Sequence, residues 1–177
     1  KTFAVDIYKH NFPGEDVAGD ITKVVEKDMP DFDYLLGGFP CQAFSTAGKK
    51  AGFDDARGTL FFDIARILKE KRPKGFLLEN VEGLVVHDKK IKSDVIGNTL
   101  STILAILKGI GYKVHWKVLN SENFGVPQIR KRIYIVGTLK DDANLEDFDI
   151  TKQTFGDIQE YGLPALETKF TKRLLKL

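Results

Sequence analysis

The chain has 177 residues, with 42% hydrophobic and 29% charged side chains and a formal net charge of +2 at pH 7. This length and composition fit one soluble globular domain with a hydrophobic core, and the near-neutral charge restricts any nucleic-acid-binding surface to local basic clusters. The single cysteine excludes an internal disulfide framework, and the lack of a long apolar run or signal peptide favours a cytoplasmic location without membrane contact.

Strand-like and helix-like segments alternate along the chain, which predicts a mostly parallel sheet covered by helices. We expect helices at residues 2–10, 22–28, 60–71 and 98–109, the last one capped by Asn98. The expected strands are residues 17–21, 35–39, 76–81, 114–119 and 132–139, and the last two would form a hairpin. Two core stripes follow from helical spacing: Leu60, Ile64, Ile67 and Leu68, and then Leu100, Ile103, Leu104 and Leu107.

The only cysteine stands in the tetrapeptide Pro40-Cys41-Gln42-Ala43, just after an apolar run that ends in two glycines. A buried strand over Tyr34–Leu36 would end at these glycines and turn into a loop that carries Cys41. Loops after strand ends form the ligand crevice of α/β sheets, so the thiol would lie where chemistry is usually done. A small buried hydrophobic residue is the alternative for an isolated cysteine.

Three further segments favour a reactive Cys41. Phe76–Val81 is a strand that ends in Glu79 and Asn80, residues 128–137 begin Gln-Ile-Arg-Lys-Arg and continue as a strand, and residues 57–63 open an amphipathic helix. In this order and spacing the chain, from Lys1 to about Leu139, resembles the C5-cytosine DNA methyltransferases, particularly the HhaI-like bacterial modification enzymes. The resemblance implies a Rossmann-like α/β sheet that uses S-adenosylmethionine.

The resemblance also implies a division of the chain. Residues 1–139 would be a partial catalytic domain, and residues 140–177, which open with an acidic, turn-like stretch, would be a linker and the start of a truncated target-recognition region. Because Lys1 lies inside a predicted helix, we expect an incomplete protein that lacks the first strand or strands and most of the small recognition domain. Such a fragment would be inactive alone.

The family's catalytic roles carry over to four residues. Carbon 5 of cytosine is a poor nucleophile, so a thiolate at Cys41 would add to carbon 6 and activate it. Glu79 would hydrogen-bond ring nitrogen 3, which requires a protonated carboxyl that burial would favour. Arg132 would bind the cytosine carbonyl oxygen, while Arg130 would hold the cysteine loop or a phosphate.

The family's binding roles carry over as well. For the methyl donor, Asp20 and Ile21 would contact the adenine, Gly38 and Pro40 the methionine part, and Leu60 the adenine ring. The usual glycine-rich first loop is absent from the sequence, which leaves half of a donor pocket. The substrate would be double-stranded DNA with a flipped cytosine, and the remaining expected contacts to the base, the loop and the phosphates are Gln42, Ser45, Lys49, Asn80 and Gln128.

Several alternatives remain at this point. Glu79 would equally serve in a surface salt bridge, Asn80 as a turn former and Gln128 with the arginines as edge-strand charges. A tRNA-cytosine enzyme of the same family would typically carry Pro-Phe-Thr where this chain has Ala43-Phe44-Ser45, which favours DNA. An inert half that needs a partner chain is the third interpretation. The three histidines are not spaced as metal ligands, so no metal site is expected. The expected protein partner is a companion restriction endonuclease, as the family resemblance implies.

Overall fold

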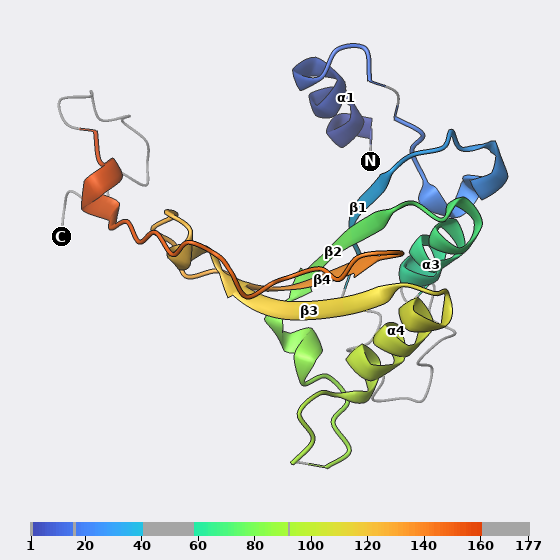
Figure 1. Cartoon of the computed structure of the whole chain (residues 1–177). Helices are drawn as coiled ribbons and strands as arrows, with labels where there is room; N and C mark the ends of the chain where they lie inside the picture. Colours follow the sequence, from blue (N-terminus) through green and yellow to red (C-terminus); the bar gives the residue numbers. More distant parts are fainter. Residues whose placement is uncertain (1, 16, 41–58, 92, 161–177) are drawn as a thin grey trace. The chain divides into compact units, whose positions relative to one another are not determined.

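The computed structural model describes residues 2–15, 17–40, 59–91 and 93–160. Its centre is a four-stranded sheet in the order β1 (Tyr34–Gly38), β2 (Gly75–Val81), β4 (Lys131–Thr138), β3 (Lys113–Asn120) (Figure 1). β1 pairs with β2 in parallel, whereas β4 runs antiparallel to β2. The described sheet is therefore mixed rather than mostly parallel, whereas the predicted α/β sheet with flanking helices is confirmed. The segment between β3 and β4 is too short for the crossover that a parallel connection would need, which agrees with the predicted hairpin of these two strands.

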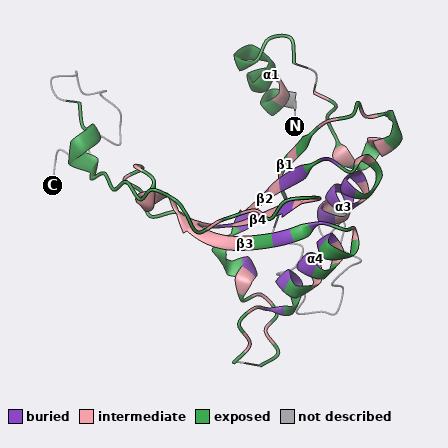
Figure 2. Ribbon diagram, viewed as in Figure 1, coloured by how far each residue is buried: buried purple, intermediate pink, exposed green. Residues whose placement is uncertain are grey.

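Two helices, α3 (Thr59–Lys71) and α4 (Asn98–Gly109), supply the helical part of the hydrophobic core. Figure 2 shows the buried residues gathered on these helices and on the strands that they cover. The core joins both helices to Phe76 and Leu78 of β2 and to Ile133 and Ile135 of β4. Of the predicted stripes, all four α4 residues are buried, as are Ile64, Ile67 and Leu68, while Leu60 is half-buried.

The segment before β1 differs from its prediction. Instead of a strand at residues 17–21 and a helix at 22–28, it contains the 3₁₀ helices η1 (Ile21–Lys23) and η2 (Glu26–Asp28). Asp20 caps η1 and ends any extended run there, and Val24 and Val25 both have extended backbones between the two short helices. β-Branched residues lower the helix propensity of such a stretch, so one continuous helix does not form.

The helix that begins at Asn98 is confirmed, but its predicted cap is not. The N-cap residue of α4 is Gly97, and Asn98 is the first helical residue. Gly97 packs directly on the backbone of His87, and its amide donates to the Val85 carbonyl at 2.7 Å. This close approach, which leaves no room for a Cβ atom, fixes where the helix starts.

β1 is displaced by one residue from its predicted bounds and is not the buried strand expected. It is the terminal strand of the described sheet, and the side chains of Tyr34 and Leu36 are 67% and 75% exposed. Its other face, with Leu35, packs on the core, and Phe39 directly after the strand is 6% exposed. The remaining expected strands are present within one residue of their predicted bounds as β2, β3 and β4.

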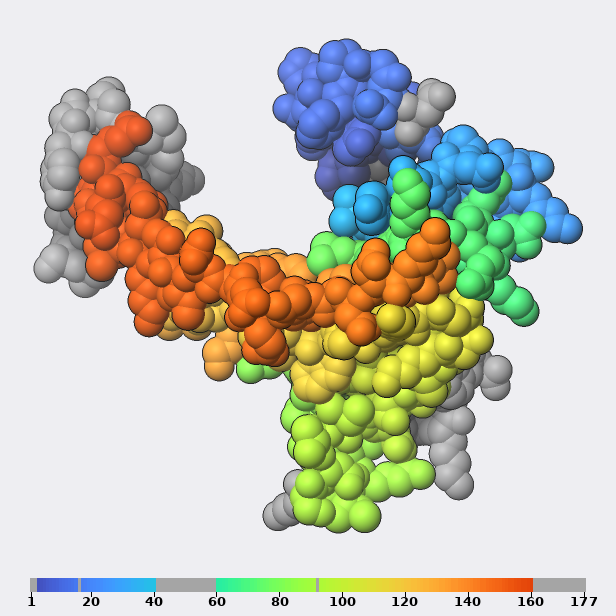
Figure 3. Space-filling model, in the orientation of Figure 1, coloured from blue at the N-terminus to red at the C-terminus, as the bar shows by residue number. Residues whose placement is uncertain are grey.

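The described part of the first 119 residues also contains α1 (Thr2–Asn11), which was predicted, and η4 (Glu82–Val85), which follows β2. After β4 the chain runs along β3 (orange on yellow, Figure 3). Lys117 of β3 forms an ion pair with Glu146 at 2.6 Å. Among the described residues, no helix is both long enough and apolar enough to cross a membrane.

The chain divides into two compact units. The first comprises residues 1–119 and 131–148 and holds the core described above. The second comprises residues 120–130 and 149–177. It contains η5 (Ser121–Asn123) and η6 (Phe155–Ile158), and a bridge joins Phe124 to Thr151.

Candidate active site

Glu79 lies on the face of the sheet opposite to α3 and α4. The strand register places it between Gly38 of β1 and Tyr134 of β4. Its Oε1 atom is 2.9 Å from Nε of Arg132, and the two side chains are 41% and 22% exposed, respectively. The predicted carboxylate and one predicted arginine are thus brought together, although Glu79 lacks the burial that its protonated form was expected to use.

Asn80 points the opposite way, into the core, and is 3% exposed. Its Nδ2 atom donates to the carbonyl of Phe39 at 2.8 Å, and its Oδ1 atom accepts from the Val81 amide at 2.8 Å. Phe39 immediately precedes Pro40 and Cys41. The amide of Asn80 therefore ties the end of β2 to the backbone just before Pro40 and Cys41.

Three of the predicted donor-binding residues line one groove, although they come from separate segments. Ile21 comes from η1, Gly38 from the end of β1 and Leu60 from the first turn of α3. The groove has a volume of about 430 Å³. The remaining lining residues are mostly apolar and are Met29, Phe32, Tyr34, Leu35, Leu36, Gly37, Ile64 and Ile67.

Asp20 stands beside this groove and caps η1. Its Oδ1 atom accepts hydrogen bonds from the Thr22 hydroxyl at 2.8 Å and from the Thr22 amide at 3.1 Å. These two bonds, the hydroxyl first, lower the pKa of Asp20, so its carboxylate is ionised at neutral pH. Within the described residues Oδ2 makes no hydrogen bond, and it can accept one from a ligand.

S-adenosylmethionine fits these residues. The groove offers apolar walls for an adenine ring, and Asp20 adds an acceptor for a polar hydrogen at its edge. Among the described residues, a Cβ atom on Gly38 would have only ordinary contacts, the nearest being with Glu79 at 3.6 Å. The packing of these residues therefore does not require glycine at residue 38, whereas close approach of a ligand to the backbone would.

The other predicted residues lie in the second unit, after β1, or outside the described part of the chain. Arg130 and Gln128 belong to the second unit and are both exposed. There the Arg130 amide donates to Asn120 Oδ1 at 2.9 Å, and the Gln128 carbonyl accepts from Ser121 Oγ at 2.5 Å. Pro40 is exposed after β1. Four predicted residues lie outside the described residues: Cys41, Gln42, Ser45 and Lys49.

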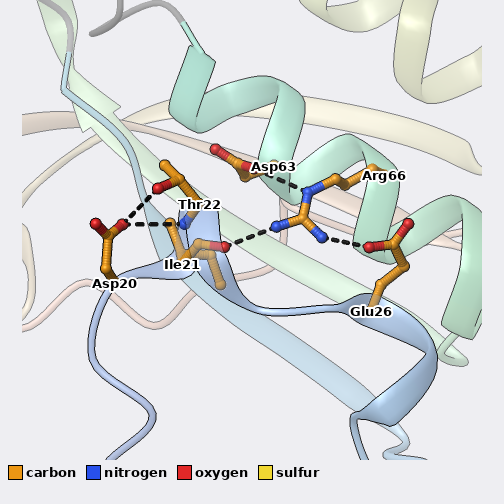
Figure 4. A network of polar contacts seen from close by, with 6 residues as sticks. All are labelled: Asp20, Ile21, Thr22, Glu26, Asp63 and Arg66. Carbon is orange, nitrogen blue, oxygen red and sulfur yellow. Dashed lines mark hydrogen bonds and ion pairs between the residues drawn. The ribbon is translucent and has the colours of Figure 1, made fainter.

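Sequence reasoning missed Arg66. Its guanidinium contacts η1, η2 and its own helix α3, as Figure 4 shows. Only the spacing of Asp63 and Arg66, three residues apart on a helix, was visible in the sequence, and that pattern is typical of any surface ion pair. In the described ranges no three His, Cys, Asp or Glu side chains are grouped so that they could hold a metal ion.

The fold is that of known methyltransferases. The chain is similar to a candidate DNA modification methyltransferase encoded within an E. coli prophage, with a TM-score of 0.70 and 25% identity over 94% of this chain and 47% of that one. The S. pombe Dnmt2 methyltransferase shares the fold with a TM-score of 0.67 and 22% identity, covering 90% of this chain and 49% of that one.

The sequence comparisons define the family. The model of the C-5 cytosine-specific DNA methylases matches residues 1–176, and the chain belongs to that family. It is 56% identical to the type II methyltransferase M.NlaIV of Neisseria lactamica over 99% of this chain and 42% of that protein. It is 47% identical to M.HhaI of Haemophilus parahaemolyticus over 85% of this chain and 43% of that protein. The chain thus spans less than half the length of these relatives.

Proposed function

We propose that this chain is part of a type II DNA (cytosine-5)-methyltransferase that uses S-adenosylmethionine. The observation that carries the proposal is the pairing of Gly38 with Glu79 across β1 and β2. Gly38 lines the groove that fits the donor, and Glu79 with Arg132 forms the polar pair expected to hold a cytosine. Donor and base would then meet at the end of β1, where Gly38 stands beside Glu79.

The proposed chemistry assigns a step to each residue. The Cys41 thiolate forms a bond to carbon 6 of the cytosine while Glu79 places a proton at ring nitrogen 3, and Arg132 stabilises the carbonyl oxygen. The bound donor supplies an electrophilic methyl group for carbon 5. Loss of the carbon-5 proton to water, release of the thiolate and return of the nitrogen-3 proton to Glu79 then restore the aromatic ring and the free enzyme.

Asn80 would hold the cysteine loop in register with this chemistry. Its bond to the Phe39 carbonyl is buried, so it is not weakened by competition with water. The loop residues Gln42, Ser45 and Lys49, together with Gln128 and Arg130, would contact the flipped nucleotide and its phosphates. Because relatives such as M.NlaIV carry the name type II methyltransferase, we also propose a companion restriction endonuclease.

The 177 residues match 42% of the length of M.NlaIV, so we propose that they do not turn over alone. The decisive experiment therefore uses the protein at its full natural length. It is mixed with S-adenosylmethionine and duplex DNA that contains 5-fluorocytosine, and a stable adduct is sought by denaturing gel and peptide mapping. Fluorine at carbon 5 cannot leave as a proton does, so the covalent intermediate would persist.

An adduct mapped to Cys41, and lost in Cys41→Ser, would support the nucleophile, the base and the reaction together. An adduct with tRNA but not with DNA would keep the chemistry and overturn the substrate. If neither nucleic acid formed an adduct although the protein bound DNA, the proposed reaction would be wrong.

A further inference from the structure

The two short helices η1 and η2, of which η1 lines the groove proposed for the methyl donor, are weakly anchored by packing. Neither η1 nor η2 contains a buried residue, so hydrophobic burial contributes little to their placement. Short 3₁₀ helices also have poor internal hydrogen-bond geometry. Yet η1 carries Ile21, which lines the groove, and begins next to Asp20. Some other interaction must fix this segment if the groove is to keep its shape.

Arg66 of α3 supplies that interaction for η1 and also contacts η2, whose Lys27 carbonyl accepts a longer bond from Lys71 at 3.4 Å. Its Nη2 atom donates to the Ile21 carbonyl at 2.7 Å and its Nη1 atom to Glu26 Oε2 at 2.5 Å. Its Nε atom donates to Asp63 Oδ1 at 2.8 Å, one turn earlier on α3. One planar guanidinium therefore joins η1, η2 and α3 (Figure 4).

The electrostatics of this cluster favour a permanent contact. Asp63 first, and Glu26 after it, raise the pKa of Arg66, so the guanidinium stays charged. The pKa of Glu26 is lowered, first by its own backbone amide and then by Arg66, so it stays ionised. The side chains of Arg66, Glu26 and Asp63 are 28%, 30% and 12% exposed, which limits screening by solvent.

The geometry points to Arg66 as a positioning residue for the methyl donor, a role that rests on the proposed function. Arg66 binds the Ile21 carbonyl and so fixes the start of η1. The side chains at that point, Asp20 and Ile21, are the ones that would contact the adenine. Arg66 does not line the groove and would not touch the donor. Its loss should therefore weaken donor binding by loosening η1, and leave the groups around Glu79 in place.

The test measures binding of S-adenosylhomocysteine to the full-length protein by calorimetry, which needs no turnover. For Arg66→Gln we expect Kd to rise on the order of tenfold, the factor that corresponds to one charge-assisted hydrogen bond. Arg66→Lys keeps the charge but reaches fewer acceptors, so it should recover part of the loss. In methylation assays KM for S-adenosylmethionine should rise while kcat and KM for DNA stay near the wild-type values.

A matched control separates positioning from general stability. Arg72 also donates to a backbone carbonyl, that of Ile110 at 2.7 Å, but neither Arg72 nor Ile110 lines the groove. Arg72→Gln should lower the unfolding midpoint without changing Kd for S-adenosylhomocysteine. In the free protein, hydrogen exchange of residues 21–28 should become faster in Arg66→Gln and stay unchanged in Arg72→Gln.

The outcomes distinguish this inference from the proposed function. If the wild-type protein binds S-adenosylhomocysteine and Arg66→Gln binds it equally well, the positioning role is wrong and the proposed function stands. An equal rise of Kd in Arg72→Gln would reduce Arg66 to a stabilising residue and overturn the inference too. If the wild-type protein binds no S-adenosylhomocysteine, the proposed function fails, and the role at the donor fails with it.

Discussion

Glu79 and Arg132 meet diagonally across two antiparallel strands. The register pairs Glu79 with Tyr134 and Arg132 with Val81, yet Arg132 Nε reaches Glu79 Oε1 at 2.9 Å. Diagonal neighbours of this kind are within reach of long side chains, and the contact holds the guanidinium over the carboxylate. A base that binds between them would meet a hydrogen-bonding carboxyl and a cation already oriented toward each other.

Replacing the carboxylate should slow the covalent step. We expect Glu79→Gln to lower the single-turnover rate by roughly 10²–10⁴, the usual contribution of a general acid. Glu82→Gln is the matched control, because Glu82 is a nearby exposed carboxylate paired with Lys131 at 3.6 Å. Rapid-quench methylation assays would measure both. Equal rates for wild type and Glu79→Gln would leave Glu79 a purely structural residue.

The ion pair should also act as one unit in catalysis. In a double-mutant cycle of Glu79→Gln and Arg132→Ala, measured as kcat/KM, we expect the effects to be non-additive by about 0.5–3 kcal/mol. The corresponding cycle on Glu82 and Lys131, an exposed pair, should give a coupling of about 0–1 kcal/mol. Additive losses at Glu79 and Arg132 would mean that the two side chains serve the base independently.

A substitution at Gly38 tests whether the methyl donor binds close to this backbone, without disturbing the hydrophobic core. In Gly38→Ala the new methyl group would have ordinary contacts with Glu79, so we expect a stability change within about 0.5 kcal/mol. The same methyl group would stand in the groove and should raise Kd for S-adenosylhomocysteine. Gly83→Ala, where the added Cβ meets nothing within 4 Å, should change neither quantity. Undiminished affinity in Gly38→Ala would exclude a donor that approaches this backbone.

The buried amide of Asn80 should stabilise the folded protein as well as hold the backbone that precedes Cys41. Asn80→Ala removes the donor to the Phe39 carbonyl in a dry environment, which should cost about 1–3 kcal/mol in urea unfolding. Asn98→Ala, at an exposed residue whose side chain caps nothing, should stay within about 0.5 kcal/mol. If both variants unfolded at the same urea concentration, the bond would be energetically unimportant.

Local patterns predicted the parts of the fold that depend on local chemistry. The helical spacing of Ile64, Ile67 and Leu68 and the apolar run of β2 identified their elements within one residue, because periodicity reports directly on the buried face. The segment at residues 17–28 was mispredicted because one polar cap at Asp20 and two extended valines outweighed its weak periodicity.

The candidate site shows the same division. Glu79 and Asn80 were predicted from their place at a strand end together with the family resemblance, and Ile21, Gly38 and Leu60 from that resemblance alone. The contact of Arg66 with Ile21 spans 45 residues of sequence and leaves no local trace. The exposure of Tyr34 and Leu36 in β1 could not be predicted either, because an apolar run has the same sequence pattern in a central strand and in a terminal strand.

Glu79 and Asn80 are adjacent in β2 and point to opposite faces of the sheet, Glu79 toward the exposed face and Asn80 into the core. A slip of β2 by one residue would carry the Glu79 carboxylate into the apolar core and expel the Asn80 amide from its bond with Phe39. Burial of an unpaired charge is far more costly than loss of an apolar contact, so the misaligned sheet is strongly disfavoured. The same two residues that would serve the reaction thus also select the correct strand alignment during folding.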